Sequence, residues 1–192
     1  VRRGGVDPSA VTSVPGTSGV AHSRVDVATG QNDIVIVPLA NASLTPELAE
    51  RQLRAVARSD DVLLLQLEIP LETAIRAAKV GRELGMTVVL DPAPAATLPD
   101  EIWSFVDVVT PNESEETMLT GQSVSDVDSA GVVGRGFIER GVHTTRIPLA
   151  EKGGGGANTD GGRHRPRRAG TGADRTTAGG ARLGRFGAGS PA

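Results

Sequence analysis

Polar side chains follow three short apolar segments of the chain, and their types suit the binding of a charged ligand. Glu68, Asp91 and the pair Asn112 and Glu115 come just after such segments. In an open α/β sheet, ligands bind beyond the carboxyl ends of the strands. We therefore predict a ligand site at this edge of the sheet. The alternative is that Glu68 and Asp91 only cap helices or lie in solvated loops.

Asn112 and Glu115 are three residues apart at the predicted start of a helix, so they share one helix face. The amino end of a helix favours an anion, and a carboxylate there can hold a hydrated Mg²⁺ that bridges phosphate groups. The spacing thus indicates a phosphate–magnesium site. An ordinary helix start, with Asn112 as the cap and Glu115 in the first turn, explains the same residues, and this short pattern by itself favours that explanation.

Composition excludes several classes of function. The sequence has no cysteine, which excludes a disulfide scaffold, a thiol nucleophile and a cysteine-ligated metal site. It has no GxxxxGK[ST] loop and no GxGxxG after a strand, and its three histidines are too scattered to suggest a metal cluster. No apolar run approaches the roughly 18–20 residues that cross a bilayer, and the first residues have no apolar signal core. We expect a cytoplasmic protein with no membrane partner.

The apolar pattern predicts the elements that position these residues. Short aliphatic runs alternate with amphipathic segments that carry helix-capping residues. The pattern predicts strands at 62–67, 87–90, 106–109 and 143–149, and helices at 46–57, 71–84, 102–105, 112–119 and 127–140. Strands that alternate with helices through short connections predict a parallel sheet between two layers of helices. The unbroken apolar run at 62–67 is typical of a strand covered on both faces.

The two ends of the chain differ from this pattern. Residues 18–38 have two arms around a turn, the second of them β-branched, and predict a β-hairpin. Residues 151–192 contain 13 of the 25 glycines and carry a net charge of +5, whereas the first 150 residues carry −8. We therefore predict a folded domain at 1–149 and a degenerate, disordered Gly/Arg-rich tail at 150–192.

Five stretches of the sequence form a specific combination in their order and spacing. They lie at 30–38, 40–47, 65–72, 91–95 and 110–115. Over residues 1–141, this combination resembles the ribokinase/phosphofructokinase-B family of carbohydrate kinases. Gln-Leu-Glu-Ile-Pro at 66–70 and Asp-Pro-Ala-Pro-Ala at 91–95 resemble the ribokinase branch of that family.

The resemblance implies a three-layer α/β/α ribokinase-like fold, truncated in this chain, with the hairpin as a small lid over the sugar. It implies transfer of the ATP γ-phosphate to the 5-hydroxyl of D-ribose, with Mg²⁺ and a monovalent cation such as K⁺. Glu68 would bind the sugar, Asn112 the phosphate and Glu115 the metal. The stretch that includes Ala150 and Gly153 would contact the nucleotide. Relatives often dimerise through the lid, so the resemblance also implies a homodimer.

Departures from the family pattern predict that this chain transfers little or no phosphate. The family's glycine-rich sugar-binding stretch has no counterpart before Val1, and Ala181 stands where the catalytic base belongs. Alanine cannot accept a proton, so the sequence provides no catalytic residue. Pro148 and Ala150 replace the threonine and glycine of the family's nucleotide stretch. Gene decay and a reading-frame or sequencing error both explain these departures.

Two other functions are alternatives to that of a kinase. A non-catalytic remnant would bind a nucleotide or a protein partner without turnover, and the missing base favours it. A nucleic-acid binder would use the Arg-rich tail, but the body of the protein is acidic and aromatic residues make up 2% of the chain. We therefore expect small-molecule partners, a sugar and ATP, and no nucleic acid.

Overall fold

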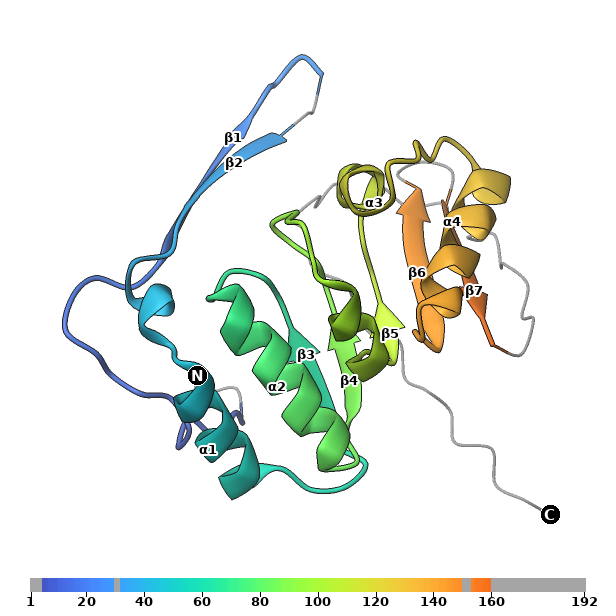
Figure 1. Ribbon diagram of the computed structural model, residues 1–192. Helices are drawn as coiled ribbons and strands as arrows, with labels where there is room; N and C mark the ends of the chain where they lie inside the picture. The colour runs from blue at the N-terminus through green and yellow to red at the C-terminus, as the bar shows by residue number, and fades with distance from the viewer. Residues whose placement is uncertain (1–4, 30–31, 150–152, 160–192) are drawn as a thin grey trace.

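The computed structural model describes residues 5–29, 32–149 and 153–159, which Figure 1 shows in colour. The strands are β1 (Val20–Val25), β2 (Asn32–Val37), β3 (Val62–Leu65), β4 (Thr87–Leu90), β5 (Val108–Val109), β6 (Thr144–Leu149) and β7 (Gly153–Asn158). The helices are α1 (Pro46–Val56), α2 (Leu71–Glu83), α3 (Glu113–Thr120) and α4 (Val127–Glu139), with the 3₁₀ helices η2 (Leu39–Ser43) and η3 (Asp100–Phe105). Every strand and helix predicted from the apolar pattern is present, although several are shorter.

The main sheet has the strand order β3-β4-β5-β6-β7, and β3 to β6 run parallel. A parallel pair needs a crossover connection, and helices lie in the connections between these strands. Leu65 at the end of β3 pairs with Leu90 of β4, which pairs in turn with Val109 of β5. The carboxyl ends of these three strands therefore lie side by side, as the sequence predicts.

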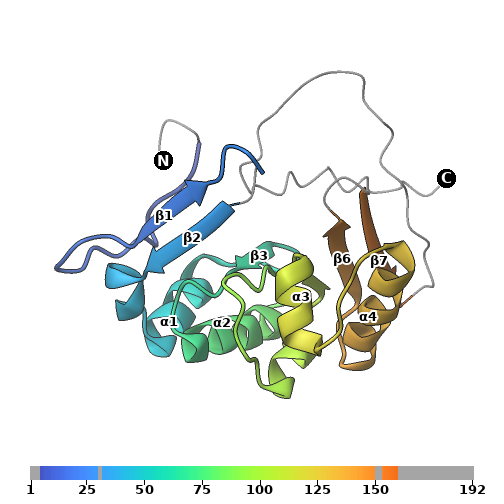
Figure 2. The same cartoon turned by 90° about the horizontal axis from the view of Figure 1, so that it is seen from above.

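Helices α1, α2 and α4 lie on one side of the main sheet (Figure 2). Helix α2 packs on β3 and β4, and α4 packs on β6 and β7. On β3, Leu65 is buried, whereas Val62 is 55% and Leu64 59% exposed. The described residues thus form an α/β fold that covers β3 on one face, and they do not provide the second covering layer that its apolar run predicts. The apolar run at 62–67 indicates that both faces of β3 suit burial. It does not indicate which part of the chain covers each face.

The core lies between the main sheet and these helices, and its largest side chains come from η3 and α4. Trp103 and Phe137 are almost fully buried, with ring centroids 5.0 Å apart and planes tilted by 58°. Such a tilted contact is a favoured arrangement of aromatic rings. None of the described helices is long and apolar enough to span a membrane.

Strand β7 corrects the predicted end of the folded domain at residue 149. Residues 153–158 pair antiparallel with β6 along its whole length, although they are mostly glycine. Backbone hydrogen bonds hold this pairing, so it needs few side chains. Small residues are in fact required, because a Cβ on Gly155 would lie 2.7 Å from the Cβ of Ala130 in α4. The rest of the predicted tail, from residue 160, lies outside the described residues.

The hairpin predicted at 18–38 is present as a separate two-stranded sheet of β1 and β2. Val20 pairs with Val37 at its base, and Arg24 forms an ion pair with Asp33 near the turn. Every side chain of β1 is exposed, and Ile34 of β2 is 50% exposed. Its aliphatic side chains therefore contribute little to the core of the body.

Candidate functional site

The residues that directly follow β3, β4 and β5 form what we call the carboxyl edge: residues 66–68, 91 and 110–115. Backbone hydrogen bonds join these strand ends. The Asp91 N–H donates to the Leu65 carbonyl at 2.9 Å, and the Thr110 N–H donates to the Leu90 carbonyl at 3.0 Å. The edge therefore brings together segments that are far apart in the sequence, and it contains Glu68, Asp91, Asn112 and Glu115.

Asn112 and Glu115 bind each other closely at the start of α3. The Asn112 side-chain oxygen accepts from the backbone N–H groups of Ser114 and Glu115, both at 2.9 Å. In return, the Glu115 carboxylate accepts from the Asn112 N–H at 2.8 Å and from its Nδ2 at 2.7 Å. This arrangement is a complete capping box. The capping explanation of the Asn-x-x-Glu spacing is thus confirmed.

The capping box leaves Glu115 able to bind a further ligand. Each of its carboxylate oxygens accepts one hydrogen bond from Asn112, and a carboxylate has about four acceptor positions in all. Burial raises the pKa of Glu115, the nearby charge of Asp91 raises it further, and the two hydrogen bonds from Asn112 lower it. A cation at this position would relieve both unfavourable effects on the ionised form.

The oxygen donors of the carboxyl edge fit Mg²⁺. The carboxylates of Glu115 and Asp91 supply hard oxygen atoms, which Mg²⁺ prefers, and the ion keeps several of its waters. In the described part of the chain, no three His, Cys, Asp or Glu side chains come together as a ready-made metal site. Two carboxylates beside a phosphate group are nevertheless the usual surroundings of Mg²⁺ in phosphoryl-transfer enzymes.

Of the other predicted site residues, one lies at the carboxyl edge, one lies elsewhere in the sheet, and two lie outside the described residues. Glu68 is half-buried in the bend after β3, at the same edge as Asp91. Gly153 begins β7 and pairs with Leu149 of β6. Strand β7 forms the opposite edge of the main sheet from β3. Ala150 and Ala181 lie outside the described residues.

Glu116 is a residue that the sequence analysis missed. Its side chain is fully buried in α3, and neither carboxylate oxygen has a hydrogen-bond partner among the described residues. Burial raises its pKa to about 7, and the charge of Glu113 adds to the effect. The sequence contains one weak signal, because Glu116 lies three residues before the partly buried Leu119 on the same helix face.

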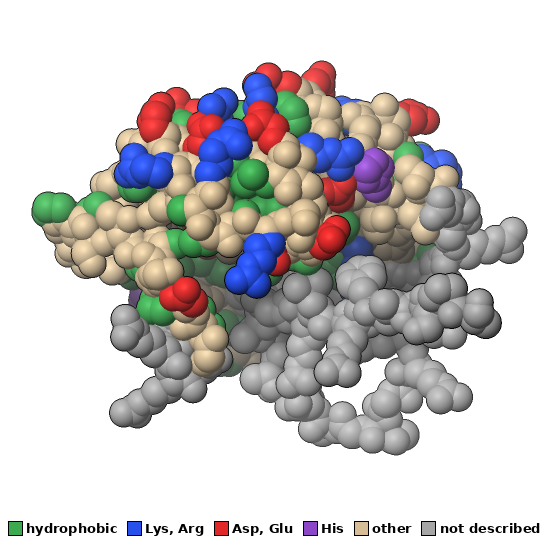
Figure 3. Space-filling model, turned by 90° about the horizontal axis from the view of Figure 1, so that it is seen from below, with side chains coloured by type: hydrophobic (Ala, Val, Ile, Leu, Met, Phe, Trp, Pro, Cys, Tyr) green, Lys and Arg blue, Asp and Glu red, His purple; other side chains and the backbone are tan. Residues whose placement is uncertain are grey.

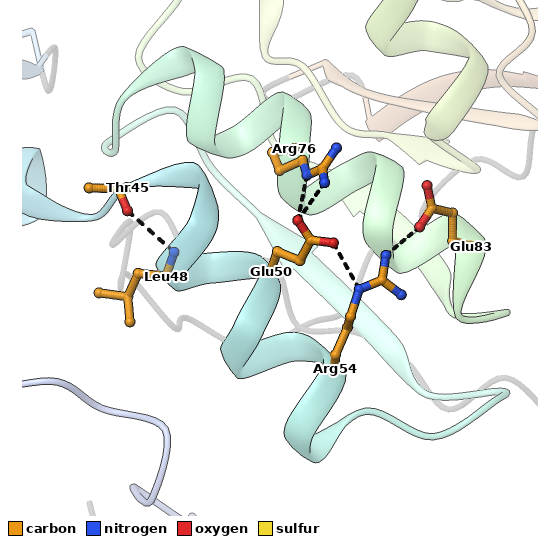
Figure 4. A network of polar contacts seen from close by, with 6 residues as sticks. All are labelled: Thr45, Leu48, Glu50, Arg54, Arg76 and Glu83. Atoms are coloured by element: carbon orange, nitrogen blue, oxygen red, sulfur yellow. Dashed lines mark hydrogen bonds and ion pairs between the residues drawn. The ribbon is translucent and has the colours of Figure 1, made fainter.

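A surface groove lies elsewhere, among α1, α2 and η3. Ile75 and Phe105 line it together with acidic and basic side chains, and it contains none of the predicted site residues. In its lining, Glu50 accepts from Arg76 and also from Arg54, which in turn binds Glu83 (Figure 4). In the view from below, acidic and basic side chains are interspersed over the described surface (Figure 3). The groove lies apart from the carboxyl edge, and we assign it no function.

Comparison with known proteins identifies the family. Residues 1–184 match the model of the pfkB family of carbohydrate kinases. The chain belongs to this family. It is 39% identical to the ribokinase of Haemophilus influenzae over 150 residues, which are 78% of this chain and 48% of that protein. The chain therefore spans about half the length of this relative.

Solved structures of family members have the same fold. The crystal structure of a ribokinase from Thermotoga maritima matches 82% of this chain and 51% of its own, with a TM-score of 0.64 and 35% identity. The structure of Arabidopsis thaliana ribokinase complexed with ribose and ATP matches 78% of this chain and 47% of its own, with a TM-score of 0.59 and 25% identity. Together with the family match, these likenesses confirm the ribokinase-like α/β fold that the sequence predicts.

Proposed function

We propose that this chain carries the substrate-binding and phosphate-binding part of a pfkB-family kinase that phosphorylates D-ribose at its 5-hydroxyl with ATP. The observation that carries the proposal is the carboxyl edge. It places the segments that contain Glu68, Asp91 and the paired Asn112 and Glu115 after the ends of three neighbouring strands. The likeness to a ribokinase bound to ribose and ATP supports the choice of substrates.

Each of these residues has a role that its chemistry explains. The Glu68 carboxylate would accept hydrogen bonds from sugar hydroxyl groups and orient the sugar, since charged acceptors form the stronger hydrogen bonds. Asn112 holds the Glu115 carboxylate in one orientation through two hydrogen bonds. Glu115 would then hold the hydrated Mg²⁺. When bound, Mg²⁺ neutralises phosphate charge during transfer.

Proton transfer is the step that this sequence does not support. Attack by a sugar hydroxyl requires a base within hydrogen-bond reach, and the family's base falls at Ala181 in this chain. We therefore expect the 192-residue chain to bind ligands and to transfer little or no phosphate. The missing base at Ala181 also supports the alternative proposal, a non-catalytic protein that binds a nucleotide or a protein partner.

Ligand binding and turnover should be measured on the same preparation. Calorimetry with ribose and with MgATP measures binding, and ribose-dependent ADP formation measures transfer, with an active bacterial ribokinase as the positive control. We expect ribose binding that is lost in Glu68→Ala and weakened in Glu68→Gln, without ADP formation above the protein-free rate. Ribose-dependent ADP formation that Glu68→Ala abolishes would overturn the expected inactivity. Absence of binding to both ligands would overturn the proposed function.

We also propose that the β1–β2 hairpin is a lid through which two copies associate. Its paired strands expose aliphatic side chains on both faces, Val35 on one and Ile34 on the other, and a lone two-stranded hairpin is only marginally stable in water. Sedimentation velocity should show a dimer for the unmodified chain and a monomer for Ile34→Ser. An unmodified chain that remains monomeric at high concentration would contradict this proposal.

A further inference from the structure

Glu68, the predicted sugar contact, lies in a short bend between β3 and α2. It is half-buried, and among the described residues its carboxylate takes part in no hydrogen bond or ion pair. The bend is fixed where α2 begins, because the Pro70 carbonyl accepts from the N–H groups of Thr73 at 2.9 Å and Ala74 at 3.1 Å. The orientation of the Glu68 carboxylate therefore depends on what holds the residues at the other end of the bend.

Hydrogen bonds tie the segment that follows β3 to the segment that follows β4. The Asp91 N–H donates to the Leu65 carbonyl at 2.9 Å, and the Leu67 N–H donates to the Ala93 carbonyl at 2.8 Å. Between these backbone contacts, Gln66 Nε2 donates to Asp91 Oδ2 at 3.0 Å. We call these contacts the loop bridge. They continue the parallel pairing of β3 and β4 beyond the ends of both strands.

The side-chain contact of the loop bridge differs from its backbone contacts. Leu67 is 9% exposed and belongs to the hydrophobic core, so burial holds it in addition to its hydrogen bond. Gln66 is exposed, and its side chain is held by Asp91. A charged acceptor strengthens this hydrogen bond, but exchange with water keeps its contribution to folding small. Loss of the contact should therefore alter the bend locally and leave the stability of the core unchanged.

We propose that Gln66 is a positioning residue for the sugar site. Through its hydrogen bond to Asp91, it holds the start of the bend so that the Glu68 carboxylate meets the sugar hydroxyl groups in one orientation. The proposal rests on the proposed function and adds a residue to its sugar site. Gln66 and Glu68 are two residues apart, and residues at this spacing lie on one face of an extended segment. A carboxylate that is already oriented favours binding, because less ordering is needed when the ligand binds.

Ribose binding to the full 192-residue chain, measured by calorimetry, tests this role without any need for turnover. Gln66→Met removes the donor and keeps the length of the side chain, whereas Asp91→Leu removes the acceptor. Asp91→Asn keeps an oxygen that can accept from Gln66. The matched control is Gln52→Met, because Gln52 Nε2 donates to Thr12 Oγ1 at 2.6 Å from α1, outside the carboxyl edge. Urea denaturation measures the stability of each variant.

We expect Gln66→Met and Asp91→Leu each to weaken ribose binding by about three- to tenfold, the range that one hydrogen bond contributes. The double variant should lose no more than either single variant, because both changes remove the same contact. Asp91→Asn should keep most of the affinity, and Gln52→Met all of it. The urea midpoint of Gln66→Met should equal that of the unmodified chain.

Several results would overturn the role of Gln66 and leave the proposed function standing. They are ribose binding that Gln66→Met does not change, additive losses in the double variant, and a loss in Asp91→Asn equal to that in Asp91→Leu. A urea midpoint that falls together with ribose affinity in Gln66→Met would also overturn it, because the role would then be structural only. Gln66→Met decides the question by itself if Asp91→Leu does not fold. A chain that binds MgATP but no ribose would overturn the sugar site and this role together, and a chain that binds neither would overturn the proposed function.

Discussion

The hairpin of β1 and β2 and the body formed by β3 to β7 with their helices use similar side chains in opposite ways. In the body, Val88, Leu90 and Phe137 are almost completely buried. In the hairpin, Val20 and Ile34 are each 50% exposed. Aliphatic residues therefore stabilise the fold in one region, whereas in the other they remain accessible for contacts that the described chain does not make.

The difference shows which region sets the stability of the protein. Buried apolar area is the main favourable contribution to folding, and the body contains the buried core. The hairpin is held by its own ladder and by the ion pair of Arg24 with Asp33. We expect substitutions in the body to change the free energy of unfolding strongly, and equivalent substitutions in the hairpin to change it little.

The largest expected effect comes from Phe137→Ala. This change removes a fully buried ring that contacts Trp103, so the free energy of unfolding should fall by about 3–5 kcal/mol. Ile34→Ala in the hairpin should change it by less than about 0.5 kcal/mol. Urea denaturation followed by the fluorescence of Trp103, the single tryptophan, measures both. Equal losses in the two variants would show that the hairpin belongs to the same cooperative core.

Glu116 should make the body less stable as the pH rises. Its pKa is about 7 in the folded protein against 4.5 in a solvated chain, so between these values the folded state binds more protons than the unfolded state. Stability is therefore greatest below about pH 4.5 as far as this group is concerned, and it is lost as the pH rises to about 7. The loss is at most roughly 3 kcal/mol.

Glu116→Gln isolates this effect, because glutamine has a similar shape and does not titrate. At pH 5 the variant and the unmodified chain should differ little, and at pH 8 the variant should be the more stable. Urea midpoints measured from pH 4.5 to 8 give the comparison. A constant difference across this range would mean that folding does not raise the pKa of Glu116.

A pair of glycines in α4 tests how closely the body is packed. A Cβ on Gly134 would lie 2.6 Å from Thr145 Oγ1 and 3.2 Å from the Ala157 Cβ, whereas a Cβ on Gly136 meets nothing within 4 Å. Gly134→Ala should lower the free energy of unfolding by about 1–3 kcal/mol through overpacking. Gly136→Ala should raise it by up to about 1 kcal/mol, because alanine favours the helix. In thermal denaturation, Gly134→Ala should therefore lower the midpoint temperature and Gly136→Ala should raise it.

The smallest expected effect is that of Arg24→Ala. The ion pair of Arg24 with Asp33 lies on the exposed hairpin, where water screens it. Its removal should leave the urea midpoint of the body unchanged, and it should alter only the amide exchange rates of β1 and β2. A shift of the body midpoint would contradict the separation of the two regions.

Much of the fold follows from local signals in the sequence. Thr45 caps α1 through a 3.3 Å hydrogen bond to its oxygen from the Leu48 N–H, and Gly85 ends α2 with a positive φ of 76°. Both residues have the types that such positions favour. The alternation of these helices with apolar runs predicted that the strands of the main sheet run parallel, because short connections through helices favour that arrangement.

The candidate site was predictable in position and not in detail. Polar residues after apolar runs indicated Glu68, Asp91, Asn112 and Glu115, and topology brought them to one edge. The hydrogen bond from Gln66 to Asp91 joins residues 25 positions apart, so it depends on the register of β3 and β4. No short stretch of the sequence specifies that register.

The family, the order of the elements and the edge at which polar residues gather follow from motifs, capping residues and apolar periodicity along the chain. The place of the β7 glycines in the sheet, and the burial of Glu116 without a partner among the described residues, become visible in the folded molecule alone. Both outcomes depend on which surface packs against a residue. A glycine becomes necessary where a helix approaches closely, and a carboxyl group becomes costly where water is excluded.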